Sequence, residues 1–482
     1  MTINFGEKMT PFGIQRLVVE GLHEQFDVDL TLKPGLNIIY GKNGRGKTTV
    51  LHILVNALEL DFKRFEHLSF RRIVLTTFNG AELQILKIHG VGLQILLDGA
   101  ATSFGGDNQS LSDAESASLR AALGPRPTYL PAFRSVLERI RNEYMSPYRD
   151  PVRESEIELL TSKEQMALRE ASESRESIIE SRSFREEASQ TARKTVQCRQ
   201  WFGSFIPVVR YPSINEVDDG LTAEWRSAQL KMAQREQNMF AEVFVRVFRT
   251  IVGLDQRESA DENEDSLIAS VASLLDDSDD ENTNHGPSEI YGRLLEAVDF
   301  LKQKGDRDSQ SVESSVLQLY LETLSTRKLE RTIAYQKTKD FESSINKFLD
   351  KKTLRIGIRE YEARGRPRSS VVRVGTKGGR SYGLSSLSSG EKQILTMLYS
   401  ASRSRFRKGM FVIDEPELSL HIDWQRQILR ELMAQAPDCQ LIACTHSPEV
   451  GADHFEETQD FEPTPTAPVM NDLFDEADHS EE

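Results

Sequence analysis

A glycine-rich loop near the start of the chain is the feature that most constrains its fold. Residues 41–49 read Gly-Lys-Asn-Gly-Arg-Gly-Lys-Thr-Thr, between the largely apolar runs 36–40 and 50–54. This is the pattern G-x-x-x-x-G-K-[ST] between a predicted strand and a predicted helix, which is the setting that the motif requires. Glycines let successive backbone N–H groups turn toward phosphates, and a helix that opens at Thr48 directs its positive end to the same anion. The motif predicts a site for a nucleoside triphosphate.

We expect this loop to hold ATP together with Mg²⁺. Lys47 is predicted to contact the β- and γ-phosphates, and the hydroxyl group of Thr48 is predicted to coordinate Mg²⁺. The other nucleotide-binding residues predicted from the loop are Asn43, Gly44, Gly46 and Thr49.

An acidic pair far along the chain supplies the second part of the predicted site. Residues 410–415 read Met-Phe-Val-Ile-Asp-Glu, an apolar run typical of a buried strand that ends in two acids. Ligands of open parallel sheets bind at the carboxyl ends of the strands. We therefore expect Asp414 to hold Mg²⁺ through its water shell and Glu415 to orient and deprotonate the attacking water.

Three shorter motifs accompany these two. They are Leu-Ser-Ser-Gly-Glu at 387–391, Ser-Leu-His at 419–421 and Thr-His-Ser at 445–447. The order of all five motifs resembles the ABC-type ATPases, and within them the branch that contains SMC, Rad50, RecF and the OLD-type ATPases. The resemblance implies an α/β fold, namely an ABC-type P-loop ATPase head with a split mixed sheet and flanking helices. It also implies a head-to-head dimer with two ATP molecules between the protomers.

The resemblance assigns further site residues. Ser388 and Gly390 match the signature that caps the γ-phosphate bound to the opposite protomer, and residues 419–421 match the D-loop. His446 matches the switch histidine and joins Glu415 as a predicted catalytic residue. The signature reads L-S-S-G-E where transporters usually have L-S-G-G-Q, which favours the SMC- and OLD-like branch over a transporter.

One motif of this family stays unassigned. The resemblance implies a Q-loop glutamine between the two halves of the head. Gln84 and Gln94 are both candidates, and the sequence does not choose between them.

Composition excludes several classes of protein. The three cysteines form no C-x-x-C pair, so neither a disulfide framework nor a zinc site is indicated. No run approaches the ~20 apolar residues of a membrane span, and the first residues lack the apolar core of a signal peptide. We therefore expect a cytoplasmic protein without a membrane partner. The net charge of the chain is −15. Two acidic stretches, 255–281 and 453–482, together carry more negative charge than the chain as a whole, so the remaining residues have a small net positive charge.

Changes in composition divide the chain into four predicted segments. Residues 154–199 are rich in Glu, Arg, Ser and Ala without a clean heptad, which favours a short antiparallel, coiled-coil-like helical insertion over a long arm. The segments are the N-terminal half of the head with the phosphate loop (1–150), the helical insertion (151–350) with an acidic loop (255–283), the C-terminal half of the head (351–455), and an acidic disordered tail (456–482).

A basic stretch opens the C-terminal half. Residues 351–380 carry ten Lys or Arg against two Glu. Residues 354–358 and 371–374 are predicted to form a β-hairpin with its turn at 365–368. Contact with the phosphate backbone of DNA and a solvated edge that opposes aggregation explain these charges equally well.

A last element bears on biological role. Residues 128–134 read Thr-Tyr-Leu-Pro-Ala-Phe-Arg, and a strand that ends in Leu-Pro-Ala-x-Arg is similar to OLD-like and defence-associated ATPases, although a plain strand with a proline turn reads the same. Overall the chain resembles stand-alone ATPase subunits of bacterial anti-phage systems, such as the PARIS or Septu ATPase. That resemblance implies a sensor or scaffold that controls a separate effector, expected to be a nuclease, in response to DNA or a phage-encoded trigger protein.

Two other functions compete with this one. The alternative is a RecF- or SMC-like ATPase that clamps DNA in repair. A self-contained nuclease is disfavoured, because the sequence shows neither a Toprim pattern nor an H-N-H cluster.

Overall fold

The structure is a computed structural model that describes residues 12–88, 92–104, 110–134, 191–251, 310–357, 371–404 and 409–466. The chain forms two compact units. We call Met1–Ser213 with Ser388–Glu482 the head unit, and Ile214–Leu387 the helical unit.

A five-stranded parallel sheet runs through the head unit, in the order β14-β3-β13-β12-β8. Its three central strands are apolar and buried almost throughout, as expected for parallel strands that are covered on both faces. Because all pairs are parallel, the carboxyl ends of β3 and β12 lie at the same edge of the sheet. The strands are β3 (Leu36–Tyr40), β8 (Thr128–Leu130), β12 (Met410–Asp414), β13 (Gln440–Thr445) and β14 (Thr458–Asp460).

A second, antiparallel sheet of seven strands belongs to the same unit, in the order β15-β2-β1-β4-β5-β6-β7. Its middle strands alternate between buried and more exposed residues, which is the pattern of a sheet with one face on a core. The strands are β1 (Ile14–Leu22), β2 (Phe26–Thr31), β4 (Arg72–Thr77), β5 (Glu82–Ile88), β6 (Gly92–Leu97), β7 (Ala100–Ala101) and β15 (Thr464–Pro465).

Helix α1 (Lys47–Glu59) lies in the core that both sheets share. Nearly all of its residues are buried, and the same apolar cluster contains side chains of β1, β4 and β5 from one sheet and of β12 and β13 from the other. The other helices that the structure describes in the head unit are η1 (Phe62–His67), α2 (Asp113–Leu123), a helix over 191–202, α11 (Ser389–Ser404), α12 (Ile422–Gln435), α13 (Pro448–Gly451) and η5 (Phe455–Glu457).

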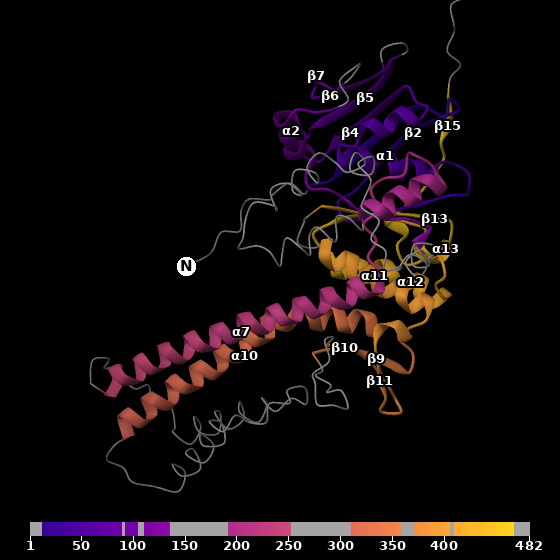
Figure 1. Ribbon diagram of the computed structural model, residues 1–482. Helices are drawn as coiled ribbons and strands as arrows, with labels where there is room; N and C mark the ends of the chain where they lie inside the picture. Colours follow the sequence, from indigo (N-terminus) through magenta and orange to yellow (C-terminus); the bar gives the residue numbers. More distant parts are fainter. Residues whose placement is uncertain are drawn as a thin grey trace, which may run out of the picture. The chain divides into compact units, whose positions relative to one another are not determined.

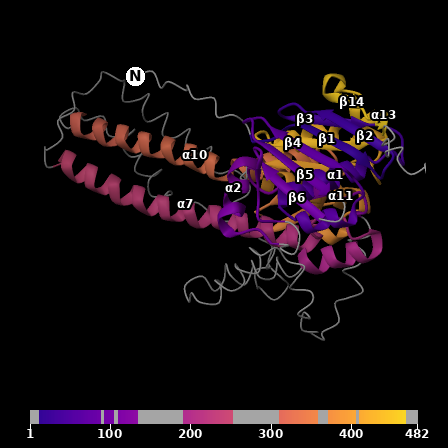
Figure 2. The ribbon, with the colours of Figure 1, turned by 90° about the horizontal axis from the view of Figure 1, so that it is seen from above.

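The helical unit consists of two long helices and a small sheet. Helices α7 (Ile214–Ile251) and α10 (Gln310–Asn346) lie side by side (Figures 1 and 2). Two ion pairs, Lys337–Glu224 at 3.2 Å and Arg327–Glu236 at 2.7 Å, show that they run in opposite directions, because the numbers rise on one helix as they fall on the other. At 38 and 37 residues, each helix is about 55 Å long.

The predicted hairpin is confirmed as part of this unit. Strand β9 (Lys352–Ile356) pairs antiparallel with β10 (Val372–Thr376), which pairs with β11 (Ser381–Tyr382) and is followed by η4 (Leu384–Ser386). The expected turn at 365–368 lies outside the described residues, as do the acidic loop 255–283 and tail residues 467–482. The predicted disordered tail began at residue 456, and this part of the prediction is wrong. Strand β14 pairs with β3 and strand β15 pairs with β2, so residues 458–465 extend the two sheets of the head unit.

The α/β fold class, a P-loop ATPase head interrupted by a helical insertion, is confirmed. The predicted split sheet is present as two separate sheets of the head unit. The compact units divide after residues 213 and 387, whereas the sequence predicted boundaries at 150 and 350. Residues before 213 join the head because Arg199 pairs with Asp61 at 3.1 Å and Arg210 pairs with the buried Glu59 at the end of α1. Among the helices that the structure describes, none has the length and apolar character needed to cross a membrane.

A buried histidine on α1 gives the head unit a predicted sensitivity to acid. His52 Nε2 lies 2.8 Å from the hydroxyl oxygen of Tyr129 on β8, and burial lowers the pKa of His52 from 6.5 to about 3. Between these values the unfolded chain binds a proton that the folded chain does not, so stability is lost as pH falls below 6.5. We expect His52 alone to lower the free energy of unfolding by about 2 kcal/mol between pH 7 and pH 5.

Denaturant titrations of wild type and His52→Gln at the two pH values measure this effect. Glutamine can still contact Tyr129 but does not titrate, so the loss between pH 7 and pH 5 should shrink by about 2 kcal/mol. His67→Gln, a change of an exposed histidine, is the control. Equal losses in wild type and His52→Gln would contradict the prediction.

Candidate nucleotide-binding site

The phosphate loop connects β3 to α1 at the carboxyl edge of the parallel sheet. Gly44 and Gly46 have φ angles of 79° and 93°, a region that side-chain-bearing residues rarely enter. Asn43 is exposed in this loop, and Thr49 is half-buried in the first turn of α1. The helix begins at Lys47, one residue before the predicted start.

Lys47 turns back onto the loop that carries it. Its side chain is buried, and Nζ donates to the carbonyl oxygens of Gly41 at 2.6 Å and Lys42 at 2.9 Å. The ammonium group therefore lies inside the curve of the loop, on the side where an anion that is bound by the loop's N–H groups would sit.

The acidic pair lies beside the loop, as the sequence predicted. Thr48 Oγ1 donates to Asp414 Oδ2 at 2.8 Å, although the two residues are 366 positions apart in the chain. Burial raises the pKa of Asp414 to about 6, and the hydrogen bond from Thr48 opposes that rise. Among the described residues, Asp414 Oδ1 has no hydrogen-bond partner. A buried carboxylate oxygen without a partner, next to a threonine hydroxyl, is a donor set that fits Mg²⁺.

Glu415 and His446 come together at the same edge. Glu415 follows the last residue of β12, and His446 follows the last residue of β13. His446 Nδ1 lies 3.4 Å from Glu415 Oε1, and both side chains are partly exposed. Glu415 has a φ angle of +46°, unusual for a residue with a side chain, and its N–H donates to the carbonyl oxygen of Cys444 at 2.8 Å.

Glu417 is a residue of this site that the sequence reasoning missed. Its Oε1 accepts from Thr445 Oγ1 at 2.5 Å and from the backbone N–H groups of His446 at 3.0 Å and Ser447 at 3.1 Å. The side chain is buried and also lies 3.3 Å from His446 Nδ1. It joins the turn after β12 to the loop after β13. The last glutamate of the sequence Asp-Glu-Pro-Glu at 414–417 was the available signal.

Arg134 stands out in the sequence only as part of the Leu-Pro-Ala-x-Arg element. Its side chain is fully buried behind the acidic turn. Nη1 donates to the carbonyl oxygens of Asp414 at 2.7 Å and Pro131 at 3.0 Å, and Nη2 donates to that of Glu415 at 2.9 Å. Burial lowers the pKa of the guanidinium, partly offset by the nearby Asp414 and Glu417.

The signature residues lie at the start of α11. The N–H of Ser388 donates to Glu391 Oε2 at 2.7 Å, and the N–H of Glu391 donates to Ser388 Oγ at 3.4 Å, so the pair caps the helix. Gly390 packs against the D-loop, because a Cβ atom at this position would lie 3.0 Å from the carbonyl oxygen of Ser419. In the part of the chain that the structure describes, no hydrogen bond joins Ser388 to the phosphate loop of the same protomer.

The two Q-loop candidates lie on the other sheet. Gln84 is in β5 and Gln94 is in β6, which pair with each other in the antiparallel sheet. Neither strand belongs to the parallel sheet that carries the phosphate loop and the acidic pair.

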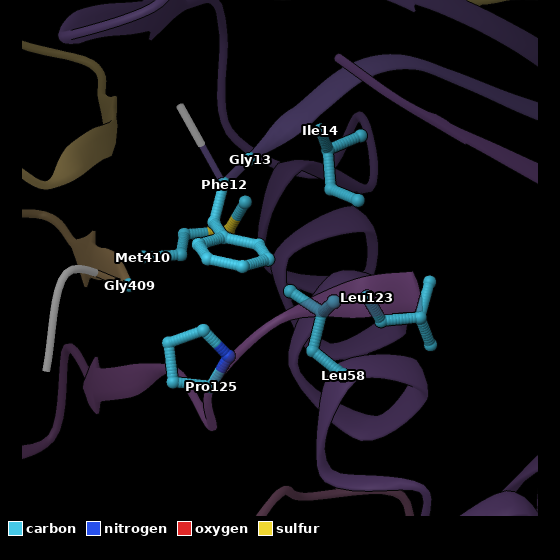
Figure 3. Close-up of a pocket in the computed structure, with 8 residues that line it drawn as sticks. All are labelled: Phe12, Gly13, Ile14, Leu58, Leu123, Pro125, Gly409 and Met410. Carbon is cyan, nitrogen blue, oxygen red and sulfur yellow. The ribbon is translucent and has the colours of Figure 1, made fainter. Parts of the chain in front are cut away.

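A small apolar pocket of the head unit is distinct from this site (Figure 3). Its lining comes from the starts of β1 and β12 and the ends of α1 and α2, so it lies toward the amino edge of the parallel sheet. Its lining residues are Phe12, Gly13, Ile14, Leu58, Leu123, Pro125, Gly409 and Met410.

Together, the sheet order and these contacts define an α/β P-loop head with the arrangement of a nucleotide-binding site. A family model described as "AAA domain, putative AbiEii toxin, Type IV TA system" matches residues 213–453, half of the 482-residue chain. The chain belongs to this family.

Solved structures of SMC head domains are among those similar to the chain. The Smc head with an extended coiled coil bound to ScpA from Pyrococcus furiosus is 13% identical, with a TM-score of 0.39 over 91% of each chain. The Smc head with a coiled coil and joint from Pyrococcus yayanosii is 15% identical, with a TM-score of 0.36 over 91% of this chain and 93% of that one. A third, SmcHead bound to the C-winged helix domain of ScpA, is 9% identical, with a TM-score of 0.40 over 94% of this chain and 98% of that one. All three TM-scores lie below 0.5, so the fold rests on the topology described above.

Proposed function

We propose that this chain binds and hydrolyses ATP with Mg²⁺, and that its ATP-dependent head dimerisation controls a separate effector in anti-phage defence. One observation supports the enzymatic part above all others. The hydrogen bond between Thr48 and Asp414 joins the phosphate loop to the acidic turn across 366 residues of sequence. Two motifs that hydrolysis needs together are thus in contact.

Each residue of the site has a proposed role. Lys47 and the N–H groups of the loop hold the β- and γ-phosphates, and Thr48 with Asp414 holds Mg²⁺. When bound, the metal offsets the negative charge of the phosphate oxygens. Glu415 orients the attacking water and accepts its proton, and His446, held next to Glu415, positions the water and the γ-phosphate.

The signature residues are proposed to act across a dimer. Ser388 is exposed at the N-terminus of α11, where the helix dipole favours an anion. In the head-to-head arrangement this anion is the γ-phosphate bound to the partner protomer. Ser388→Arg should therefore block hydrolysis and leave ATP binding by an isolated protomer intact.

Mixing two inactive variants tests this composite site. A heterodimer of Lys47→Ala and Ser388→Arg protomers has both changes in one site and neither in the other. An equal mixture should recover about a quarter of wild-type turnover, since half of the dimers are mixed and each has one intact site. Each variant alone is the control. A mixture that forms heterodimers but stays inactive would contradict composite sites.

The biological part of the proposal rests on the sequence. The motif order and the Leu-Pro-Ala-x-Arg element resemble stand-alone defence ATPases of the PARIS or Septu kind. The chain combines an ATP site with no recognisable nuclease motif, so a separate effector, expected to be a nuclease, would act when head closure holds or releases it. The trigger would be DNA or a phage-encoded protein.

Co-purification with the product of the adjacent gene tests effector control. Wild type and Glu415→Gln are compared with and without ATP, and capture should depend on nucleotide and be strongest in the variant that holds ATP. The family description names a putative toxin of a type IV toxin–antitoxin system. Toxicity or DNA cleavage by this chain alone would therefore overturn effector control in favour of a toxin.

DNA clamping in repair is the alternative function, and the basic residues of the helical unit favour testing it. Lys352, Arg355 and Lys377 lie on or beside the β9–β10 hairpin. If the hairpin follows phosphates, DNA affinity should fall steeply with salt. Absence of DNA binding at low salt would remove this alternative.

A further inference from the structure

The backbone conformation of Glu415 needs something to hold it. Its φ angle of +46° lies in the left-handed region, where a residue with a Cβ atom is disfavoured. Such conformations persist only where the surrounding structure fixes them. Because the turn directs the carboxylate toward the phosphate-loop edge of the sheet, whatever fixes the turn also fixes the proposed base.

Arg134 supplies that restraint from behind the turn. Its two terminal nitrogens span consecutive peptide units, with Nη1 on the carbonyl oxygen of Asp414 at 2.7 Å and Nη2 on that of Glu415 at 2.9 Å. On the other side, the N–H of Glu415 is held by the carbonyl oxygen of Cys444 at 2.8 Å. The peptide units before and after the Glu415 side chain are therefore both anchored.

The geometry of the guanidinium suits this task better than that of other side chains. A planar fork with fixed N–H directions can bridge two adjacent carbonyl oxygens, whereas a lysine ammonium is a point donor. Arg134 is fully buried, and its described hydrogen bonds all go to backbone carbonyl oxygens rather than to a carboxylate. In the described part of the chain, Arg134 is therefore a buried cation whose hydrogen bonds hold the backbone of this turn and of Pro131.

We propose that Arg134 is a positioning residue for ATP hydrolysis, which acts by holding Glu415 in its left-handed conformation. It is not a catalytic residue, since its bonds are to the backbone behind the turn and not to groups that face the phosphate loop. The inference rests on the proposed role of Glu415 as the base.

The experiment compares Arg134→Met with a matched change elsewhere in the head unit. Arg199 is also buried, and it bonds the carbonyl oxygen of Ile206 at 2.8 Å and Asp61 at 3.1 Å, away from the acidic turn. Arg199→Met therefore reports the general cost of losing a buried arginine. We expect Arg134→Met to lower kcat about 100-fold with KM for ATP within about threefold, because a displaced catalytic group costs rate rather than affinity. Arg199→Met should keep kcat within about threefold of wild type.

A double-variant cycle separates positioning from general damage. Once Glu415→Gln has removed the base, Arg134→Met should lower the residual single-turnover rate less than about threefold, since the group it positions is gone. Equal loss in both backgrounds, or equal loss from Arg134→Met and Arg199→Met, would overturn the inference.

A conservative variant decides the matter if Arg134→Met does not fold. Arg134→Lys can donate to one of the two carbonyl oxygens but not bridge both, so its kcat should lie between those of wild type and Glu415→Gln, with ATP affinity unchanged. Wild-type kcat in Arg134→Lys would overturn the inference. If instead Glu415 is not the base, Glu415→Gln would hydrolyse ATP as fast as wild type. That result distinguishes failure of the proposed function from failure of the inference about Arg134.

Discussion

Glu415→Gln should lower the rate of ATP hydrolysis by about 100- to 1000-fold while ATP still binds. A positioned general base contributes about 10²- to 10⁴-fold to a rate, and glutamine keeps the shape of the side chain without its ability to accept a proton. The Glu415 carboxylate lies 3.4 Å from His446 Nδ1, and the substitution removes its negative charge while it leaves the phosphate loop unchanged. ATP should therefore remain bound at closed heads.

Single-turnover hydrolysis and equilibrium nucleotide binding measure the two parts of this prediction. Glu20→Gln, the same chemical change on β1 of the antiparallel sheet, should leave both unchanged. Near-wild-type turnover by Glu415→Gln would remove this residue from the role of base.

Lys47→Ala should weaken ATP binding by at least about 100-fold. The ammonium group is buried in the curve of the loop, where its only described hydrogen bonds are to the carbonyl oxygens of Gly41 and Lys42. Hydrogen bonds between charged groups contribute about 1.5–3 kcal/mol each, and this group would meet two phosphates. The variant also loses the two hydrogen bonds from Lys47 to the backbone of the loop, which adds to the effect.

Titration with a fluorescent ATP analogue measures the affinity. Lys63→Ala removes an exposed lysine of η1 and serves as the control for charge. Equal affinities for wild type and Lys47→Ala would show that the nucleotide binds elsewhere.

The parts of the fold that were predictable are those with strong local signals. A glycine motif between apolar runs identified β3, α1 and the loop, and an apolar run ending in two acids identified β12 and the position of Asp414. Because the carboxyl ends of parallel strands meet at one edge, the amino-acid sequence alone was enough to predict that these two segments lie together.

The parts that could not be predicted depend on contacts between distant segments. Arg134 bonds the turn at 414–416, and Glu417 bonds the loop at 445–447. Both sets of bonds exist only because β8, β12 and β13 are neighbours in the sheet. The local periodicity of a sequence does not predict the order of strands in a sheet. The observed boundaries of the two units differ from the predicted ones for the same reason. Residues 191–213 look like the rest of a polar helical insertion, yet Arg199 and Arg210 fix them to the end of α1.

Phosphate release by the purified 482-residue chain with ATP and Mg²⁺ tests the central claim most directly. Wild type, Lys47→Ala and Glu415→Gln are measured in parallel, together with bound nucleotide. We predict steady hydrolysis by wild type, no hydrolysis and no bound ATP with Lys47→Ala, and bound ATP without appreciable hydrolysis with Glu415→Gln. Hydrolysis at the same rate in all three proteins would contradict the assignment of this site as an ATPase.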